Sequence, residues 1–296
     1  MDTMAGQDAD QLPLIAVTGV TGNIGGAAAA ALSAEGYPLR LLARESSLGR
    51  VPRLKGAQAA PFIFGYDPQT VEALRGVGTV FMVSAHEGPS RVQEHKGFVD
   101  AAQEAGVRHL VYLSFDGASE DADFTLGRDH YATEEYIKKS GLPYTFLRDN
   151  FYIEAFIEWG KSGIIAGPAG DGRVSAVSQR DVAAAVTAVL RNPALHSNTT
   201  YTLTGPQPLT LGEIAGILSR ETGTAVTYKN ETLEEAYASR RAQYDAPDWE
   251  LDAWVSTYTA IGSGRLAGVT HDVELITGAL PLSFEDVLRI SGQGTR

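Results

Sequence analysis

Short apolar runs alternate with helical stretches through the first half of the chain, and this alternation narrows the choice of fold more than any other feature. A strand in a parallel sheet is buried on both faces and needs a crossover helix to cover it. The predicted strands span residues 14–18, 39–43, 61–64, 79–84, 110–114 and 144–147. This order predicts an α/β protein with a doubly wound parallel sheet of the Rossmann type.

The predicted helices of the first half span residues 24–35, 68–74, 91–105 and 131–139. After residue 150 the pattern loosens. We expect an apolar segment at 151–157, a glycine- and proline-rich turn at 163–172, strands at 201–203 and 226–228, and helices at 181–190, 210–220, 233–242, 249–261 and 283–290. Thr210 and Glu213 have the spacing of a capping box, and Asp181 opens its helix in the manner of a cap.

Composition and charge exclude several classes of protein. The chain has no cysteine, which removes disulfides, thiolate nucleophiles and cysteine-ligated metals. Its formal net charge of −12 disfavours binding to nucleic acid or to an anionic membrane surface. No apolar run approaches the roughly 20 residues that span a bilayer, and residues 1–11 lack the features of a signal peptide. We therefore expect a cytoplasmic protein.

A glycine-rich segment directly follows the first predicted strand and opens an alanine-rich helix. Glycine in such a turn permits positive φ and lets the backbone approach a ligand, while the first amides of the helix face its phosphates. This strand-turn-helix context predicts that the pyrophosphate of a dinucleotide binds here; a turn that only packs helix on strand is the alternative. The predicted cofactor-binding residues of the turn are Gly19, Thr21, Gly22, Asn23, Ile24 and Gly25.

The end of the second strand indicates which nicotinamide cofactor binds. NAD-binding proteins usually carry an acid there, which accepts from the ribose 2′-hydroxyl. Here Arg44 follows the strand, 19 residues after Gly25, and a guanidinium can bind a 2′-phosphate. We therefore expect NADP, with NADPH preferred over NADH, although Glu45 could serve as the acid. Ser84 and Ala85, which end the fourth strand, should also lie along the cofactor.

These features suggest three regions. Residues 1–12 are expected to form a disordered tail, and residues 13–150 an NAD(P)-binding Rossmann domain. Residues 151–296 should form a smaller α/β C-terminal region that binds substrate and acts as a lid, with some strands and helices returning to the Rossmann core.

The glycine spacing resembles that of the extended or atypical short-chain dehydrogenases/reductases. Segments 80–84, 107–114, 130–134 and 140–148 are similar to the NmrA-like family, and within it to the type 2 NAD(P)H:quinone oxidoreductases. The resemblance covers about residues 14 to 215. It implies the Rossmann fold, a nicotinamide cofactor and a reductase activity.

The resemblance also implies candidate catalytic residues. The superfamily uses a serine with Tyr-x-x-x-Lys, which Ser114 and Tyr131 match in part, but Glu135 replaces the lysine and would raise the tyrosine pKa. The quinone-reductase branch has His-x-x-x-Glu instead, which His130 and Glu134 reproduce at i and i+4. These two can form an ion pair on one helix face, either in the site or merely exposed. His130 is also a candidate proton donor.

Residues 148–154 resemble the family segment that crosses the cleft beside the nicotinamide. Aromatic side chains there could stack on a flat acceptor, although aromatic residues often belong to the core instead. The predicted substrate residues are Asn150, Phe151, Tyr152, Phe156 and Trp254, with Trp159 and Tyr258 as further candidates. The histidines are scattered, no metal motif is present, and we predict no metal site.

Three functions are compatible with these features. The first is an NADPH-dependent oxidoreductase that passes hydride to a small molecule, a quinone or a similar conjugated carbonyl. The second is a non-catalytic NADP(H)-binding redox sensor of the NmrA type, which the missing Tyr-x-x-x-Lys would suit. The third is a specialised biosynthetic reductase or isomerase. A homodimer is compatible with each of them.

Overall fold

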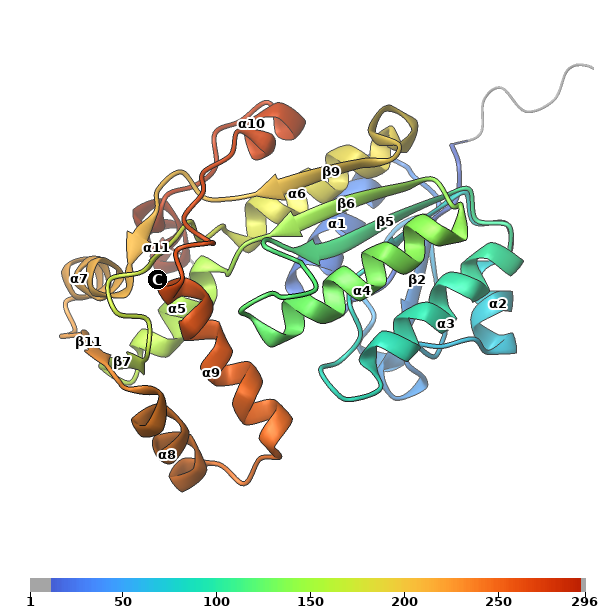
Figure 1. The fold of residues 1–296 in the computed structure, drawn as a ribbon. Coiled ribbons are helices and arrows are strands. Elements are labelled where there is room, and N and C mark those ends of the chain that lie inside the picture. The colour runs from blue at the N-terminus through green and yellow to red at the C-terminus, as the bar shows by residue number, and fades with distance from the viewer. Residues whose placement is uncertain (1–11, 294–296) are drawn as a thin grey trace, which may run out of the picture.

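A seven-stranded parallel sheet forms the centre of the protein (Figure 1). The structure is a computed structural model that describes residues 12–293. The strand order is β3-β2-β1-β4-β5-β6-β9, so the predicted doubly wound Rossmann-type fold is confirmed. Apart from residue 12, the tail predicted at 1–12 lies outside the described residues. The seven strands are β1 (Ile15–Val17), β2 (Leu39–Ala43), β3 (Ala57–Pro61), β4 (Thr79–Met82), β5 (His109–Phe115), β6 (Tyr144–Asp149) and β9 (Thr199–Leu203).

Successive side chains of each strand enter different layers, because the side chains of a strand alternate between its two faces. Val17 packs in the apolar layer of α1 and α6, whereas its neighbour Ala16 packs in the layer of α2, α3 and α4. These two layers cover opposite faces of the sheet (Figure 1). Their helices are α1 (Asn23–Ala34), α2 (Pro68–Leu74), α3 (Arg91–Glu104), α4 (Thr125–Ser140) and α6 (Gln179–Arg191).

The third strand differs from the prediction. It spans 57–61 rather than 61–64 and pairs with β2 only, at the edge of the sheet. An edge strand is not buried on both faces, so its residues need not form an apolar run. The apolar run that suggested a strand has another role, because Phe62 and Phe64 pack on Phe98 of α3, with ring centroids 5.8 and 5.4 Å from it.

The later part of the chain returns to the sheet and also builds a core of its own. β9 pairs with β6, and α6 packs on α1. A second apolar cluster gathers residues from α5, α7, α9 and α11. The remaining elements are α5 (Ile153–Gly160), β7 (Ile164–Gly167), β8 (Arg173–Val174), β10 (Leu209–Thr210), α7 (Leu211–Thr222), β11 (Thr227–Asn230), α8 (Leu233–Gln243), α9 (Asp248–Gly262), α10 (Asp272–Thr277), α11 (Phe284–Gln293) and two 3₁₀ helices at Glu45–Arg50 and Pro193–His196. The division of the chain at residue 150 stays a prediction.

Of the local features predicted in this later part, one is confirmed and two differ from the structure. The capping box is confirmed, because Thr210 accepts from the Glu213 amide and Glu213 from the Thr210 amide. The turn predicted at 163–172 was partly wrong, since it contains β7, which pairs with β11 in parallel. Ser178 rather than Asp181 is the N-cap of α6; Asp181 is the third residue of the helix.

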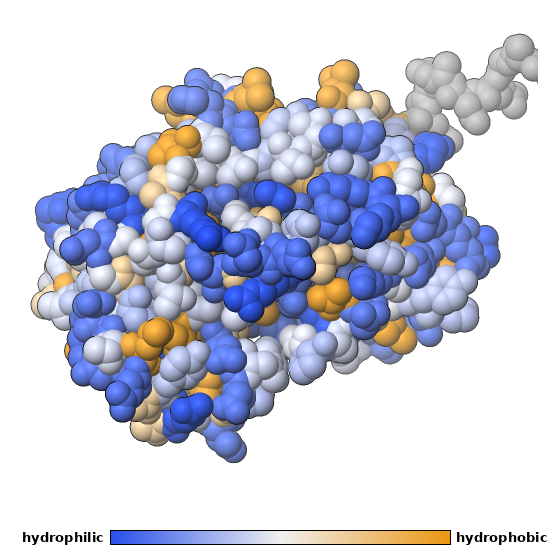
Figure 2. Space-filling view, viewed as in Figure 1, coloured by the Kyte–Doolittle hydropathy of each residue, from blue (hydrophilic) through white to orange (hydrophobic). Residues whose placement is uncertain are grey.

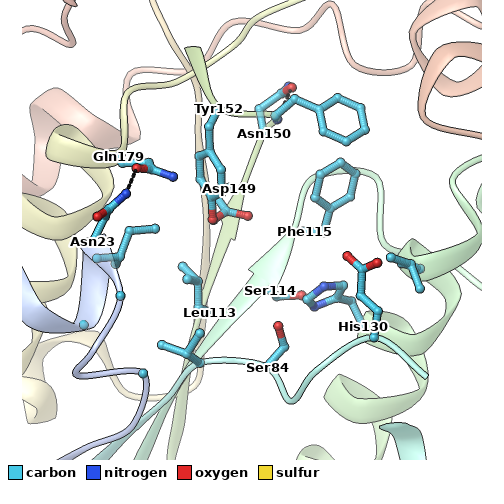
Figure 3. Close-up of a pocket in the computed structure, with 18 of the residues that line it drawn as sticks. Asn23, Ser84, Leu113, Ser114, Phe115, His130, Asp149, Asn150, Tyr152 and Gln179 are labelled. Carbon is cyan, nitrogen blue, oxygen red and sulfur yellow. Dashed lines mark hydrogen bonds between the residues drawn. The ribbon is translucent and has the colours of Figure 1, made fainter. Parts of the chain in front are cut away.

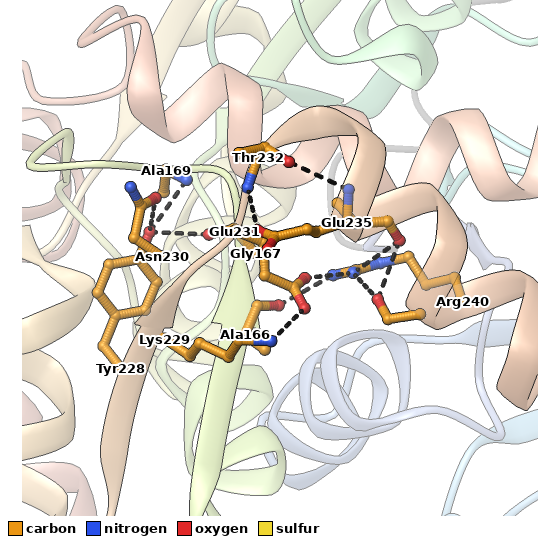
Figure 4. A network of polar contacts seen from close by, with 12 residues as sticks. Ala166, Gly167, Ala169, Tyr228, Lys229, Asn230, Glu231, Thr232, Glu235 and Arg240 are labelled. Atoms are coloured by element: carbon orange, nitrogen blue, oxygen red, sulfur yellow. Dashed lines mark hydrogen bonds and ion pairs between the residues drawn. The ribbon is translucent and has the colours of Figure 1, made fainter.

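A buried polar network holds α8 against β7 and β11 (Figure 4). The Glu231 carboxylate, whose side chain is 2% exposed, forms ion pairs of 2.9 Å with Arg240 and 3.4 Å with Lys229. Arg240 also donates to the carbonyl oxygen of Ala166 in β7, at 2.9 Å. A buried carboxylate is costly without such partners, so this network fixes α8 to the rest of the C-terminal region.

The face of the molecule drawn in Figure 2 is largely hydrophilic, with hydrophobic residues in small groups. Among residues 12–293, no helix has the length and apolar character that crossing a membrane would require.

Candidate active site

The glycine turn between β1 and α1 is closely packed. Gly19 has a φ of +64°, and a Cβ there would lie 2.9 Å from a methyl carbon of Val83. A Cβ on Gly25 would lie 2.6 Å from the carbonyl oxygens of both Thr18 and Gly19. A Cβ on Gly22 would meet only the Gly19 oxygen, at 3.4 Å. The turn therefore has no room for a side chain at Gly19 and Gly25, whereas a Cβ on Gly22 would make a single contact at 3.4 Å.

The amino terminus of α1 is free to receive an anion. Its N-cap is Gly22, and no side chain caps the helix, so the amides of the first turn lack a partner within the helix. The Asn23 side chain instead donates to Gln179, the first residue of α6, at 2.8 Å. Uncapped amides at the positive end of the helix dipole are suited to bind a pyrophosphate. Because the glycines of the turn have no side chains, the pyrophosphate can approach the backbone amides closely.

A cavity of about 520 Å³ extends from this turn across the carboxyl ends of β4, β5 and β6. Figure 3 shows Asp149 between the Asn23–Gln179 pair on one side and Phe115 and His130 on the other. The cavity brings together most of the predicted site residues, namely Gly19, Thr21, Gly22, Asn23, Ile24, Gly25, Ser84, Ser114, His130, Asn150, Phe151 and Tyr152.

Three phenylalanine rings form the apolar wall of this cavity. Phe115 lies 4.8 Å from Phe124 and 4.9 Å from Phe151, and the latter two rings are 5.3 Å apart, measured between centroids. They come from the end of β5, the residue before α4 and the segment after β6. Such a cluster can pack against a planar conjugated molecule and exclude water from it.

The predicted ion pair between His130 and Glu134 does not form. His130 contacts Arg91 through Nε2, at 3.2 Å, and Tyr112 through Nδ1, at 2.9 Å. Because arginine can only donate, Nε2 accepts and Nδ1 carries the hydrogen of a neutral ring. Burial lowers the pKa of His130 well below its usual 6.5, and the Arg91 guanidinium lowers it further. His130 is therefore neutral, and its single N–H is directed to Tyr112.

Glu134 is fully buried and binds a different set of partners. Its Oε1 accepts from the Ser114 hydroxyl at 2.6 Å and from Arg148 Nε at 2.9 Å, and its Oε2 accepts from Arg148 Nη2 at 2.6 Å. The helical spacing placed both candidates on one face of α4 correctly, but the neighbouring strands supply the partners. A carboxylate only accepts, so the Ser114 proton points to Glu134 rather than into the cavity.

Asp149, the last residue of β6, contributes a buried carboxyl group to the cavity. Its Oδ2 accepts the hydroxyl hydrogen of Tyr152. The adjacent Asn150 is held by Asp116 at 3.0 Å and by the Leu266 carbonyl oxygen at 3.1 Å. The segment that follows β6 therefore crosses the cleft with fixed side chains.

Several predicted site residues lie outside this cavity. Phe156, a predicted substrate residue, is fully buried in the C-terminal core beside Trp159. Trp254 lies instead in a second cavity of about 550 Å³, which Trp159 and Tyr258 also line.

Three other candidates stand apart from the cavity as well. Ala85 is buried and its amide donates to His95 at 2.8 Å, and Tyr131 does not line the cavity. Arg44 is exposed just after β2, the strand next to β1. Among residues 12–293, no group of three or more histidine, aspartate and glutamate side chains is placed to hold a metal ion.

Sequence reasoning missed several lining residues. Arg91, which is 4% exposed, gave no signal beyond opening a predicted helix. Asp149 lies in the segment 148–154 that the sequence predicts to cross the cleft. Its position as an acid at the end of a strand is a signal that could have identified it as a site residue. Gln179, Phe115 and Phe124 line the same cavity as the turn only because the tertiary fold brings them there.

Several known proteins that are similar to this chain in sequence or structure are named as reductases. The chain is 31% identical over 278 residues to an NAD(P)H azoreductase from Xenophilus azovorans, covering 92% of this chain and 96% of the relative. It is 28% identical over 260 residues to quinone oxidoreductase 2 of Escherichia coli, covering 86% and 90%. A crystal structure of an NADPH-dependent quinone oxidoreductase from that organism, complexed with NADPH, matches with a TM-score of 0.84 at 24% identity, covering 94% and 99%.

A triphenylmethane reductase from a Citrobacter species, solved as a complex with NADP(H), matches with a TM-score of 0.79 and 29% identity, covering 93% of this chain and 99% of the other. The family model for the NmrA-like family matches residues 12–245, about four-fifths of the chain. These matches confirm the resemblance seen in the sequence. The chain is an oxidoreductase, and it belongs to the NmrA-like family.

Proposed function

We propose that this protein is an NADPH-dependent reductase that transfers hydride to a quinone or a similar conjugated acceptor. The observation that carries the proposal is the cavity, which joins a glycine turn suited to a pyrophosphate to a wall of phenylalanine rings. A bound reduced nicotinamide supplies the hydride. The relatives named for azo compounds, quinones and triphenylmethane dyes support a flat, conjugated acceptor.

In this proposal the residues of the chain bind and orient the reactants. The amides at Gly22 and the first turn of α1 hold the pyrophosphate, and Ser84 and Ser114 line the path along the strand ends. Phe115 and Phe151 pack against the face of the acceptor and exclude water. Such positioning brings the hydride donor and the acceptor to reacting distance.

We also propose that Arg44 gives the preference for NADPH over NADH. It is exposed where β2 ends, and β2 neighbours the strand that leads into the glycine turn. A guanidinium there can bind a ribose 2′-phosphate with two charge-assisted hydrogen bonds.

The test is to follow NADPH oxidation spectroscopically with a simple benzoquinone, an azo dye and a cationic triphenylmethane dye, and to measure NADPH binding by calorimetry. We expect binding of NADPH and turnover of at least one conjugated acceptor. NADPH binding without turnover of any acceptor would contradict the reductase and favour a sensor of cofactor redox state. The absence of binding would contradict the assignment of the glycine turn itself.

A further inference from the structure

Reduction of a neutral quinone by hydride also consumes a proton, and the cavity contains few groups able to supply one. The Ser114 proton is directed to Glu134, and the single N–H of His130 is directed to Tyr112. Glu87 also lines the cavity, but it is exposed to solvent. The candidates first suggested by the sequence are therefore poorly placed to donate.

Asp149 has the surroundings of a neutral carboxylic acid. It is 5% exposed and lines the cavity. Its strand neighbour Arg148 points to the other face of the sheet, where it binds Glu134. Among residues 12–293, Tyr152 is the sole side chain hydrogen-bonded to the Asp149 carboxyl group, and it occupies Oδ2. The backbone amide of Asp149 also hydrogen-bonds to this carboxyl group, and we place the acid proton on Oδ1, the oxygen to which Tyr152 does not donate.

The charges around Asp149 favour the same state. Asp116, the residue that follows β5, is also a carboxyl group, and the groups on the side of α1 and α6 are the uncharged Asn23 and Gln179 (Figure 3). Burial, chiefly, and then Asp116 raise the pKa of Asp149 to about 8, against the lowering effect of the Tyr152 hydrogen bond. Near neutral pH the group is accordingly mostly protonated.

We propose that Asp149 donates the proton that accompanies hydride transfer to the acceptor, and that Tyr152 orients its carboxyl group. This role rests on the proposed reductase function. It makes Asp149 a catalytic residue in the segment that crosses the cleft.

The chemistry balances for a quinone. The hydride brings two electrons and one hydrogen from the nicotinamide, which is oxidised. The O–H bond of Asp149 breaks, its proton forms a new O–H bond on the quinone oxygen, and the quinone is reduced to a hydroquinone. The Asp149 carboxylate then regains a proton from water, which completes the cycle.

Two acceptors with different proton demands separate this role from a structural one. A quinone needs hydride and a proton, whereas a cationic triphenylmethane dye becomes a neutral product on receiving hydride alone. In Asp149→Asn, which keeps the size of the side chain, we expect kcat for benzoquinone to fall about 100-fold, the scale of general acid catalysis. Reduction of the cationic dye should change by less than about twofold, and NADPH affinity should be unchanged.

The pH dependence gives a second criterion. In the wild type, quinone reduction should decline as the pH rises through about 8, because Asp149 loses its proton, while dye reduction should not follow this profile. Tyr152→Phe should lower quinone reduction less than Asp149→Asn does. Asp181→Asn, which alters another buried carboxyl group away from the cavity, should leave the ratio between the two acceptors unchanged.

A measurement without turnover tests the protonation directly. Infrared spectra of the cofactor-free protein below pH 8 should contain a C=O band of a protonated carboxyl group that is missing in Asp149→Asn. Absence of this band from the wild type would overturn the proposal whatever the activity. An equal loss of quinone and dye reduction in Asp149→Asn would also overturn it, as would no loss of either. If the wild type shows the band but reduces no acceptor, the proposed reductase function fails, and the donor role fails with it.

Discussion

The glycine turn can be tested sterically by replacing Gly25 with alanine. The new Cβ would lie 2.6 Å from two backbone oxygens, about 0.8 Å inside ordinary contact. Overpacking of this kind costs about 1–3 kcal/mol, and rigid backbone atoms on both sides place it near the upper figure. A gain in helix propensity of at most about 1 kcal/mol offsets part of this cost. The net loss of about 2 kcal/mol corresponds to a fall in Tm of roughly 4 °C for a chain of this size.

Two matched glycines serve as controls. Gly22→Ala meets only one oxygen, at 3.4 Å, so Tm should stay within about 1 °C of the wild type although NADPH binding weakens, because Gly22 faces the cavity. Gly216→Ala in α7 meets nothing within 4 Å and should raise the free energy of unfolding by about 0.5–1 kcal/mol with unchanged binding. Calorimetric scanning and NADPH titration measure both quantities. A Gly25→Ala protein as stable as the wild type, with normal NADPH affinity, would refute the steric reasoning.

Three further predictions concern single side chains. Arg44→Ala should lose about 1.5–3 kcal/mol of NADPH binding, the strength of a hydrogen bond to a charged group, with little change for NADH in fluorescence titrations; equal losses for both cofactors would contradict a 2′-phosphate contact. Arg240→Met leaves the Glu231 carboxylate buried with a weaker partner and should lower stability in urea by about 3 kcal/mol, whereas removing the exposed Arg75 should cost less than about 0.5 kcal/mol. Burial lowers the pKa of His95 to about 3, so between pH 6.5 and pH 3 only the unfolded state binds a proton at this side chain. The wild type therefore loses stability as the pH falls through this range, and His95→Gln should reduce that loss by up to about 1.4 kcal/mol per pH unit. An unchanged dependence of stability on pH in His95→Gln would contradict this prediction.

Elements were predicted correctly from the sequence where a single local requirement, such as burial of a strand on both faces, determines the residue pattern. Central strands such as β4 are buried on both faces, so their apolar runs are unmistakable, and a turn that needs glycine at 19 and 25 can be recognised by spacing. The prediction failed at the edge strand β3, where that requirement is relaxed. The doubly wound parallel sheet was therefore predictable, and the bounds of its edge strand were not.

The site was less predictable because its chemistry depends on partners far apart in sequence. The spacing of His130 and Glu134 correctly indicated a shared helix face, but it could not indicate that Arg148 and Tyr112 compete for them from neighbouring strands. The raised pKa of Asp149 depends on burial that only the assembled fold produces. The sequence pattern identifies candidate site residues, whereas the tertiary structure determines which side chain has a proton that it can donate to the acceptor.

The pairing of β6 with β9 bears on how the chain is made. Strand β6 ends at Asp149, and the strand that covers its outer edge begins only at Thr199. During synthesis, about 50 residues must therefore emerge after β6 before its open hydrogen-bonding edge is covered, and uncovered edges promote association between nascent chains. A fragment stopped at residue 150 would keep that edge exposed and should aggregate, whereas one extended through Leu203 would close the sheet.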